Sequence, residues 1–470
     1  MAVRVQDYIG KKVYMIGIGG SSMSGLAMLL KDLGYEVSGA DNDRSKKTAH
    51  LEELGIPVDI GHDPEKVEGK DLIVYSAAIH EDNPQMRRAR DLGLPRLERA
   101  ELLGQLMLGY RDVICVSGTH GKTTTTAMLS QVLVECGQEP TVHIGGELPA
   151  IGGSTLLGKQ DVFIAEACEY SRSFMQFHPT VGVILNIDED HLDYYKDIDE
   201  IESAFADFAA LTPADRGCLV GWGDDPRVRR VLENSGRKHR LYGISPANEL
   251  RAEDISYDEL GRPHFTATLF GHQLCEVDLS VSGEKNLLDA LAVIGVAEML
   301  QLPMSRVAQV LSEYRGAKRR FELTSETDGV KVYTDYAHNP AEISTAISIA
   351  KHQPHHTLWA VWQPHTYSRT KTLIRQFLKE TFTEADRLLV TDICAARETD
   401  PGDISSEMLI EPLRENGCDA HLTPTFDDAE RYLREHWQKG DLVITLGCGD
   451  IYRLNDQIAR HGDTGSKKKD

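Results

Sequence analysis

The stretch "VICVSGTHGKTTTTAML", residues 113–129, combines an apolar run, a turn with two glycines and a helical segment that begins at Lys122. Its first four residues are apolar and rich in β-branched side chains, which is typical of a central parallel strand. Gly118 and Gly121 allow a tight turn in which several backbone N–H groups point inward at the N-terminus of the helix. The stretch therefore predicts an anion-binding loop in an α/β protein.

The side chains of this turn indicate a nucleotide triphosphate. Lys122 can reach the β- and γ-phosphates, and the Thr123 hydroxyl is placed to bind a magnesium ion. The G-x-x-x-x-G-K-[ST] pattern requires glycine where Val116 stands, so the loop begins at Gly118 instead. An ordinary glycine-rich turn with a solvent-exposed lysine is the alternative, but strand, turn, Lys-Thr pair and helix all favour phosphate binding.

Length and composition narrow the class of protein. A chain of 470 residues predicts two or three domains, and its net charge of −22 argues against nucleic acid as a partner. No apolar run is as long as a membrane span and no signal peptide opens the chain, so we expect a cytoplasmic protein without membrane insertion. The eight cysteines form no C-x-x-C pair, a pattern that favours reduced, packed thiols over a disulfide framework or a zinc site.

A first unit precedes the phosphate loop. Residues 11–41, "KKVYMIGIGGSSMSGLAMLLKDLGYEVSGAD", read as strand, glycine turn, helix and a second strand that ends at Asp41. Gly17 and Gly19 match the start of a dinucleotide fingerprint, but Ser22 occupies the place of its third glycine. The pattern indicates a nucleotide-like phosphate near a helix N-terminus rather than NAD in particular; a tight turn without a ligand stays open.

Two further strands of the central unit deliver polar groups. The strand 161–165 leads to Glu166, and a second strand leads to the run 186–193, which contains His191. Carboxyl ends of parallel strands share one edge of a sheet, so these groups are expected at the same edge as the phosphate loop. Together with Thr123 they could hold a divalent ion between nucleotide and substrate, although His191 alone would fit a structural histidine.

A third unit follows the basic stretch "GAKRRFE", residues 316–322, and alternates strands with helical segments as a second doubly wound sheet does. Polar residues stand at the ends of its expected strands, which predicts a substrate cleft there. They are Asp335, His338, His365, Arg369, Asp392 and Arg397. The tail "GDTGSKKKD", residues 462–470, is predicted to be disordered.

Six motifs in order resemble the Mur ligases of peptidoglycan synthesis: G-T-H-G-K-T-T-T, E-A-C-E-Y-x-x-S-F, N-I-D-x-D-H-L-D, G-x-x-R-R-F-E, D-Y-A-H-N-P and Q-P-H-T-Y-S-R-T. With the glycine turn of the first unit, the resemblance extends from Gly17 to about Ile451. It implies three α/β domains. These are a Rossmann-like domain that binds a UDP-sugar (1–108), a central P-loop domain with a parallel or mixed sheet that binds ATP (109–317), and a C-terminal Rossmann-like domain that binds an amino acid and closes on ATP (318–470).

The activity implied by the resemblance is ATP-dependent amide formation with Mg²⁺. ATP phosphorylates the lactoyl carboxylate of UDP-N-acetylmuramate, the amine of L-alanine attacks the acyl phosphate, and ADP and phosphate leave. A monomer and a homodimer are both compatible with the sequence, and so is some tolerance of glycine or serine in place of alanine, because a methylene contributes only about 1–3 kcal/mol to discrimination.

The resemblance also assigns roles to individual residues. Lys122, His338 and Arg369 are implied in catalysis, with Arg369 holding the alanine carboxylate through its planar fork. The residues implied in ATP binding are Gly118, Thr119, His120, Gly121, Lys122, Thr123, Thr124, Asn286, Arg320 and Asp335. Those implied in substrate binding are Gly19, Gly20, Ser21, Asp41, Tyr336, His338 and Arg369, and those implied in metal binding are Thr123, Glu166 and His191.

The chain departs from the family pattern at three points. Several sister ligases carry a modified lysine about fifteen residues after the metal histidine, but "DEIESAFADF" has none, so the metal would depend on Glu166 and His191. The adenine segment reads Lys285, Asn286 and Asp289 instead of His-Asn with a second asparagine, which leaves the adenine contacts open. Thr366 stands where some members have arginine, so Arg369 is expected to hold the carboxylate alone.

Other functions account for fewer of these motifs. A sister ligase that attaches a preformed peptide, or an enzyme like folylpolyglutamate synthase, is disfavoured because Q-P-H-T-Y-S-R-T fits a small amino acid held by its carboxylate. A non-catalytic nucleotide-binding scaffold does not account for Lys122 and Thr123 together with Glu166 and His191. An NAD-dependent dehydrogenase, which Gly17 and Gly19 alone would allow, has no need of the phosphate loop.

Overall fold

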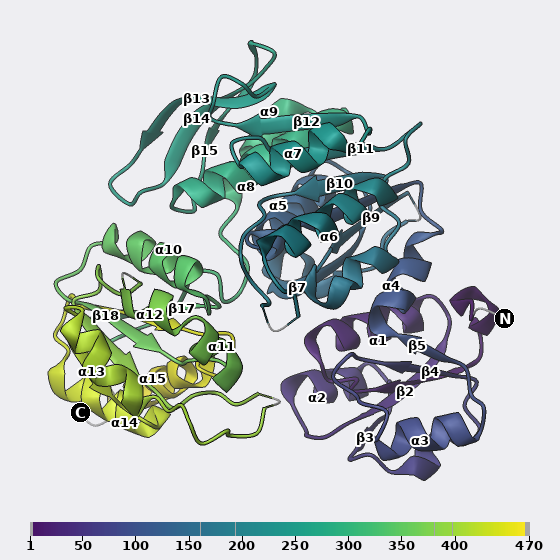
Figure 1. The fold of residues 1–470 in the computed structure, drawn as a ribbon, viewed down its shortest axis with the longest axis horizontal. Helices are drawn as coiled ribbons and strands as arrows, with labels where there is room; N and C mark the ends of the chain where they lie inside the picture. Colours follow the sequence, from purple (N-terminus) through teal and green to yellow (C-terminus); the bar gives the residue numbers. More distant parts are fainter. Residues whose placement is uncertain (1–2, 160, 193, 380, 397, 466–470) are drawn as a thin grey trace. The chain divides into compact units, whose positions relative to one another are not determined.

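The computed structural model describes residues 3–159, 161–192, 194–379, 381–396 and 398–465 (Figure 1). Asp193 and Arg397, which the sequence analysis places at strand ends, lie outside these residues. Residue contacts divide the chain into two units. The first comprises residues 1–254, 265–277 and 287–314, and the second comprises residues 255–264, 278–286 and 315–470. Strands and helices alternate in both, which confirms the predicted α/β class.

The N-terminal sheet has five parallel strands in the order β3-β2-β1-β4-β5. In β1, Val13 and Met15 belong to one buried cluster and Tyr14 and Ile16 to another, so both faces of the strand are covered. This is the predicted Rossmann-like arrangement. Its elements are η1 (Val5–Tyr8), β1 (Lys12–Ile16), α1 (Ser21–Asp32), β2 (Glu36–Asp41), α2 (Lys46–Glu53), β3 (Val58–Ile60), η2 (Pro64–Val67), β4 (Leu72–Tyr75), α3 (Pro84–Asp91), β5 (Arg96–Glu98) and α4 (Arg99–Met107).

The central sheet has ten strands in the order β15-β14-β13-β12-β11-β10-β6-β9-β7-β8. Strand β6 pairs in parallel with β10 and β9, which confirms the predicted central position of residues 113–116. Strands β13, β14 and β15 extend the sheet beyond what the sequence analysis predicted. The elements are β6 (Asp112–Ser117), α5 (Lys122–Glu135), β7 (Thr141–Leu148), η3 (Pro149–Ile151), β8 (Gly153–Leu156), β9 (Val162–Glu166), η4 (Tyr170–Gln176), β10 (Val181–Ile184), α6 (Ile198–Leu211), β11 (Cys218–Trp222), α7 (Pro226–Asn234), β12 (His239–Gly243), β13 (Leu250–Tyr257), β14 (Pro263–Leu269), β15 (His272–Asp278), α8 (Glu284–Met299) and α9 (Met304–Glu313).

The C-terminal sheet has six strands in the order β16-β17-β21-β18-β19-β20, and only β16 runs antiparallel to its neighbour. Trp362 and Trp359 of β18 belong to different buried clusters, one with α10 and α13 and the other with α14 and α15. Helices therefore cover both faces, as predicted. The elements are β16 (Glu322–Thr327), β17 (Val330–Asp335), α10 (Pro340–Lys351), β18 (Leu358–Trp362), α11 (Tyr367–Thr372), α12 (Ile374–Lys379), β19 (Arg387–Val390), α13 (Glu407–Glu415), β20 (Ala420–Leu422), α14 (Phe426–His436), β21 (Leu442–Leu446) and α15 (Tyr452–Gly465).

The predicted disorder of residues 462–470 is wrong for its first part, because α15 continues to Gly465. Leu454 and Ile458 of this helix are fully buried, and a Cβ added at Gly462 would lie 2.6 Å from the Thr327 side chain. Burial of Leu454 and Ile458 thus stabilises a helix that continues into the first part of the polar segment. Residues 466–470 lie outside the described part of the chain.

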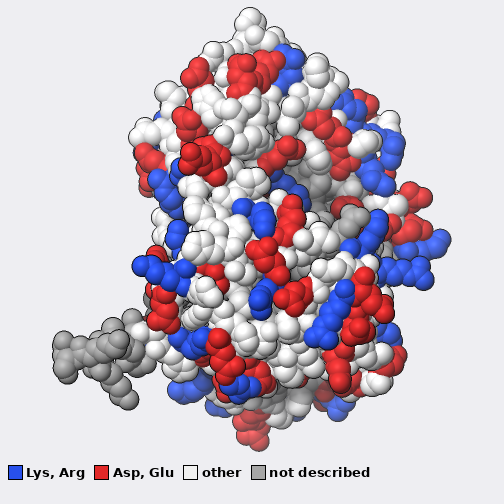
Figure 2. Space-filling view, turned by 90° about the vertical axis from the view of Figure 1, so that its left-hand side faces the viewer, with Lys and Arg blue, Asp and Glu red and all other residues white. Residues whose placement is uncertain are grey.

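The surface charge is mixed on the face drawn in Figure 2, where acidic and basic side chains lie among uncharged ones. In the described residues, no helix combines the length and the apolar character needed to cross a bilayer.

All eight cysteines are free thiols. Burial raises the pKa of seven of them, to about 11 for Cys168 and Cys275 and about 12 for Cys448. The seven are Cys115, Cys136, Cys168, Cys218, Cys275, Cys418 and Cys448.

Candidate active site

The phosphate loop has the local structure that the sequence predicts. Strand β6 ends at Ser117, α5 begins at Lys122, and the loop between them contains Gly118 with φ 141° and Gly121 with φ 85°. Such positive φ values favour glycine. The N–H of His120 donates to Oδ1 of Asn186 at 2.7 Å, which ties the loop to the segment after β10.

The Lys122 ammonium lies inside this loop. Its Nζ donates to the carbonyl oxygens of Gly118 and Thr119 at 2.5 and 3.0 Å and pairs with the Glu169 carboxylate at 3.0 Å. Burial by itself lowers the pKa of Lys122, but nearby carboxylates, with Glu169 foremost, outweigh burial and hold the pKa above its ordinary value. Lys122 is therefore a permanent cation at the N-terminus of α5.

Glu169 is a site residue that the sequence analysis missed. It is 2% exposed, and its carboxylate lies 3.0 Å from Nζ of Lys122 and 3.8 Å from Nε2 of His191. Glu169 lies three residues after the end of β9, just before a bend at Ser171 and Arg172, which both have positive φ. The available signal was the second glutamate of E-A-C-E-Y. The structure thus brings Lys122, Glu169 and His191 together.

Glu166, the predicted metal ligand, ends β9 as expected and accepts a hydrogen bond from the Gly145 N–H at 2.8 Å. A Cβ at Gly145 would lie 2.9 Å from the Glu166 carboxylate, and one at Gly146 would lie 2.8 Å from the Thr123 side chain. The glycine pair of β7 therefore allows a close approach to both predicted ligands. A hydroxyl, carboxylates and an imidazole are groups that suit a divalent cation. Within the described residues, no group of three or more His, Cys, Asp or Glu side chains is already arranged to hold a metal.

The glycine turn of the N-terminal sheet is held by Asp41, whose carboxylate accepts from the Gly19 N–H at 2.8 Å. Lys47 donates to the Ser21 hydroxyl at 2.5 Å, so a cation lies at the N-terminus of α1. The Ser22 hydroxyl contacts Nε2 of His143 in β7 at 2.8 Å. Amides, hydroxyls and Lys47 give this turn the character of an anion site; the sequence analysis missed Lys47 because it comes from α2.

Two residues of the segment predicted to contact adenine have different contacts in the structure. Asn286 of α8 donates from its side chain to the Ser282 carbonyl at 2.7 Å. Asp289, one turn further, is 8% exposed and accepts from the Thr125 hydroxyl of α5 at 2.9 Å. Asp289 therefore connects α8 to the phosphate-loop helix, a packing role in which asparagine is not required.

In the C-terminal sheet, Asp335 ends β17 and accepts from the N–H groups of Phe321 and Ala337 at 2.7 and 2.8 Å. Burial raises the pKa of its carboxyl group, and the Arg320 guanidinium partly offsets that effect. Arg320 also lies 5.2 Å from the centre of the Tyr336 ring. The predicted residues Arg320, Asp335 and Tyr336 are thus neighbours.

Arg319 fixes the G-A-K-R-R-F-E segment, residues 316–322, which precedes Asp335 and Tyr336 in the chain. Its guanidinium lies 4.8 and 4.9 Å from the ring centres of Tyr336 and Tyr452, and it donates to the carbonyl oxygens of Gly447 and Gly449 at 2.8 and 3.1 Å. Cation–π contacts and hydrogen bonds therefore hold the G-A-K-R-R-F-E segment against the loop after β21.

Arg369 lies in α11, directly after β18. Thr366 caps this helix by accepting from the Arg369 N–H at 3.3 Å, so the residue that replaces the family's arginine has a structural role. Burial is the main cause of the raised pKa of Cys448; the Arg369 guanidinium lowers that pKa and the Glu342 carboxylate raises it. The charges of Arg369 and Glu342 therefore both shift the pKa of a thiol in the loop after β21.

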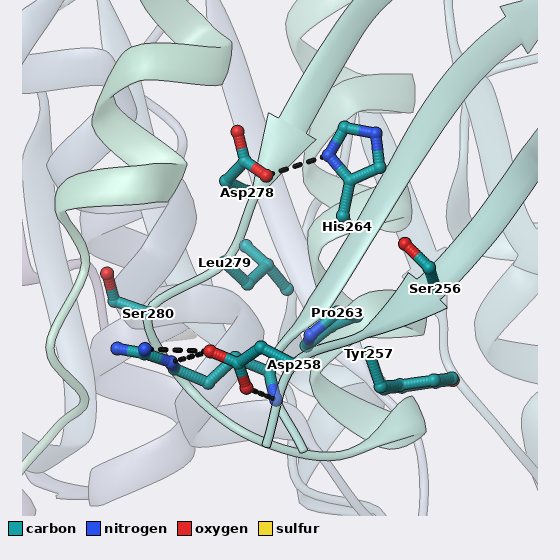
Figure 3. Close-up of a pocket in the computed structure, with 9 residues that line it drawn as sticks. Ser256, Tyr257, Asp258, Pro263, His264, Asp278, Leu279 and Ser280 are labelled. Carbon is teal, nitrogen blue, oxygen red and sulfur yellow. Dashed lines mark hydrogen bonds and ion pairs between the residues drawn. The ribbon is translucent and has the colours of Figure 1, made fainter. Parts of the chain in front are cut away.

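A cavity of about 400 Å³ lies among β13, β14 and the segment after β15 (Figure 3). His264 bonds to Asp278 at 2.7 Å, and Arg262 bonds to Asp258 at 2.7 Å. None of the predicted site residues is among the described residues that line this cavity. Its charged side chains are paired with one another, so the cavity does not present a cluster of one charge.

Three family descriptions match successive parts of the chain. Residues 12–111 match "Mur ligase family, catalytic domain", residues 116–297 match "Mur ligase middle domain" and residues 319–449 match "Mur ligase, glutamate ligase domain". The chain therefore belongs to the Mur ligase family, as the motifs predicted.

Within this family, the chain is similar over nearly its full length to ligases that are named for UDP-N-acetylmuramate and L-alanine. The UDP-N-acetylmuramate–L-alanine ligase of Acetivibrio thermocellus is 44% identical over 96% of both chains. That of Caldanaerobacter subterraneus subsp. tengcongensis is 43% identical over 95% of this chain and 97% of the relative. The crystal structure of UDP-N-acetylmuramate-alanine ligase from Thermotoga maritima superposes with a TM-score of 0.82 at 26% identity, covering 97% of this chain and 100% of that chain.

Proposed function

We propose that this protein joins L-alanine to the lactoyl carboxylate of UDP-N-acetylmuramate at the expense of ATP, through an acyl phosphate, as a step of peptidoglycan precursor synthesis. The observation that carries the proposal is the near full-length identity of 44% to a relative of that activity. The close approach of Lys122, Glu169 and His191 beside the phosphate loop supports it, because phosphoryl transfer requires concentrated positive charge and metal-binding groups.

In the central sheet, the loop from Gly118 to Thr124 cradles the ATP phosphates, and Lys122 neutralises charge on the transferred phosphoryl group. Thr123, Glu166, Glu169 and His191 would hold Mg²⁺, which would supply positive charge to neutralise the phosphate groups when bound. Asn286, Arg320 and Asp335 are assigned to the nucleotide by family resemblance.

The remaining residues bind the two other substrates. Gly19, Gly20 and Ser21, with Lys47 beside them, bind the diphosphate of the sugar nucleotide, and Asp41 keeps their turn in shape. In the C-terminal sheet, Arg369 holds the alanine carboxylate, and Tyr336 and His338 border the amine.

We also propose domain boundaries at residues 108/109 and 317/318. Three separate sheets and the matched ranges 12–111, 116–297 and 319–449 support them. A cytoplasmic location fits an enzyme that uses ATP and a soluble sugar nucleotide, and its product would serve cell-wall growth, cell shape and division. The enzyme acts as a monomer or a homodimer.

The test is phosphate release from ATP with UDP-N-acetylmuramate and each amino acid in turn, and with a preformed tripeptide. We expect release with L-alanine, weaker release with glycine or serine, and none with the tripeptide. Release with the tripeptide alone would replace the proposal with a peptide ligase.

A further inference from the structure

The segment between β17 and α10 places a carboxylate against a histidine. Asn339 caps α10 by accepting from the Glu342 N–H at 3.0 Å, which makes Glu342 the third helical residue. A glutamate at this position often returns to the N–H of the capping residue. Here its Oε2 lies 3.2 Å from the backbone N of His338 and 3.2 Å from Nδ1 of the same residue.

This geometry determines the tautomer of the imidazole. Nδ1 of His338 lies within hydrogen-bond distance of two oxygens, the Glu342 carboxylate at 3.2 Å and the Tyr336 carbonyl at 3.1 Å. Both oxygens only accept hydrogen bonds, so Nδ1 carries the hydrogen. In the neutral ring Nε2 then holds the lone pair and can accept a proton. The side chains of His338 and Glu342 are 15% and 17% exposed, so neither is a freely solvated surface group.

The surroundings of this pair suit the amine of an amino acid. The Tyr336 ring lies edge-on to His338 with ring centres 5.7 Å apart, and the charges of Glu342 and Arg369 both shift the pKa of the Cys448 thiol. A carboxylate held by Arg369 would direct the ammonium of the same amino acid toward this group of residues. That ammonium must lose a proton before its nitrogen can attack.

We propose that Nε2 of His338 takes this proton and that Glu342 is the positioning residue that holds His338 in the required tautomer. The inference rests on the proposed function. One N–H bond of the alanine ammonium breaks and its proton goes to Nε2; the freed lone pair forms the C–N bond at the acyl carbon. The C–O bond to phosphate then breaks, phosphate leaves with the electron pair, and the second proton of the nitrogen goes to the departing phosphate.

The experiment compares two nucleophiles in the full-length enzyme. Hydroxylamine is largely unprotonated at pH 7.5, so it traps the acyl phosphate as a hydroxamate without help from a base. His338→Asn keeps a donor near the position of Nδ1 but removes Nε2, and Glu342→Gln removes the carboxylate charge. Asp428→Asn is the matched control, because Asp428 caps α14 of the same sheet at the same helical position.

For His338→Asn we expect alanine-dependent turnover to fall by about 10²- to 10⁴-fold, the usual contribution of a general base, while hydroxamate formation stays within about twofold. Glu342→Gln should lower alanine turnover by about tenfold or more, again without loss of hydroxamate. Asp428→Asn should resemble Glu342→Gln in its loss of thermal stability and leave both rates unchanged.

Equal losses with both nucleophiles would show that His338 and Glu342 support the acyl-phosphate step or the fold, and would overturn the inference. Retention of alanine turnover within about twofold in His338→Asn would overturn it as well. The proposed function is tested separately on the wild-type enzyme. If that enzyme releases no phosphate with L-alanine, both the proposed function and the role of His338 as a base are wrong.

Discussion

The buried imidazole of His143 makes the stability of the first unit depend on pH. The side chain is 4% exposed and lies between the hydroxyls of Ser22 and Thr155, at 2.8 and 3.3 Å. Burial, assisted by the Arg99 charge, lowers the pKa of His143 to about 3, whereas an unfolded histidine titrates near 6.5. Because the folded value is the lower one, the unfolded chain binds the extra proton between these two values.

His143 lowers the stability of the fold only at acidic pH. Above about pH 6.5 the imidazole is neutral in both states and contributes no pH dependence. At pH 4.5 the unfolded imidazole is protonated and the folded one is not, so about two units of pH at about 1.36 kcal/mol each cost the fold about 2.7 kcal/mol. This stability is lost as the pH falls toward the folded pKa.

His143→Gln removes the titration and keeps an amide that can contact Ser22. We expect the variant to be the less stable protein at pH 7 and to lose about 2.7 kcal/mol less than the wild type between pH 7 and pH 4.5. Urea denaturation with hydrogen exchange read from β7 peptides measures the local free energy of unfolding. His272→Asn, at an exposed histidine, is the control. Its free energy of unfolding should differ from that of the wild type by the same amount at pH 7 and at pH 4.5. If the free energies of unfolding of the wild type and His143→Gln fall in parallel between pH 7 and pH 4.5, His143 is not the cause of the pH dependence.

Three further outcomes are expected. Lys122→Ala should abolish amide formation while calorimetry still detects binding of UDP-N-acetylmuramate; near-normal turnover would show that the assignment of the phosphate loop is wrong. Glu169→Gln should reduce turnover more than Glu166→Gln does, because Glu169 contacts both Lys122 and His191 in the structure; a larger loss of turnover in Glu166→Gln, measured by steady-state kinetics, would make Glu166 the more important carboxylate. Arg369→Lys should raise the KM for alanine by about ten- to a hundred-fold, since hydrogen bonds to charged groups contribute roughly 1.5–3 kcal/mol, with little change for ATP; equal changes for all substrates would indicate a role in folding.

Local features of the fold could be predicted from the sequence because each depends on a few neighbouring residues. The apolar run at 113–116 and the pair Gly118 and Gly121 specify strand and turn, and α5 begins at Lys122 as expected. Likewise, β9 ends at Glu166.

Features that depend on distant contacts could not be predicted in the same way. Glu169 contacts Lys122 across 47 positions of sequence, and no local pattern specifies that contact. Asp289 meets Thr125 across 164 positions of sequence. The predicted disorder of the tail failed for a similar reason, since packing of one helix face is not visible in a polar composition.

The thiols described above have a practical consequence for measuring motion in this enzyme. Maleimide reagents attack thiolates, and a raised pKa leaves few thiolates at neutral pH. Seven of the eight native cysteines have raised pKa values, with burial the largest cause in each. A cysteine introduced at an exposed position of each unit would therefore accept a fluorophore well ahead of these seven. With Cys394 replaced by serine, donor and acceptor dyes could report the distance between the units during turnover, without a cysteine-free background that would require refilling the buried positions one by one.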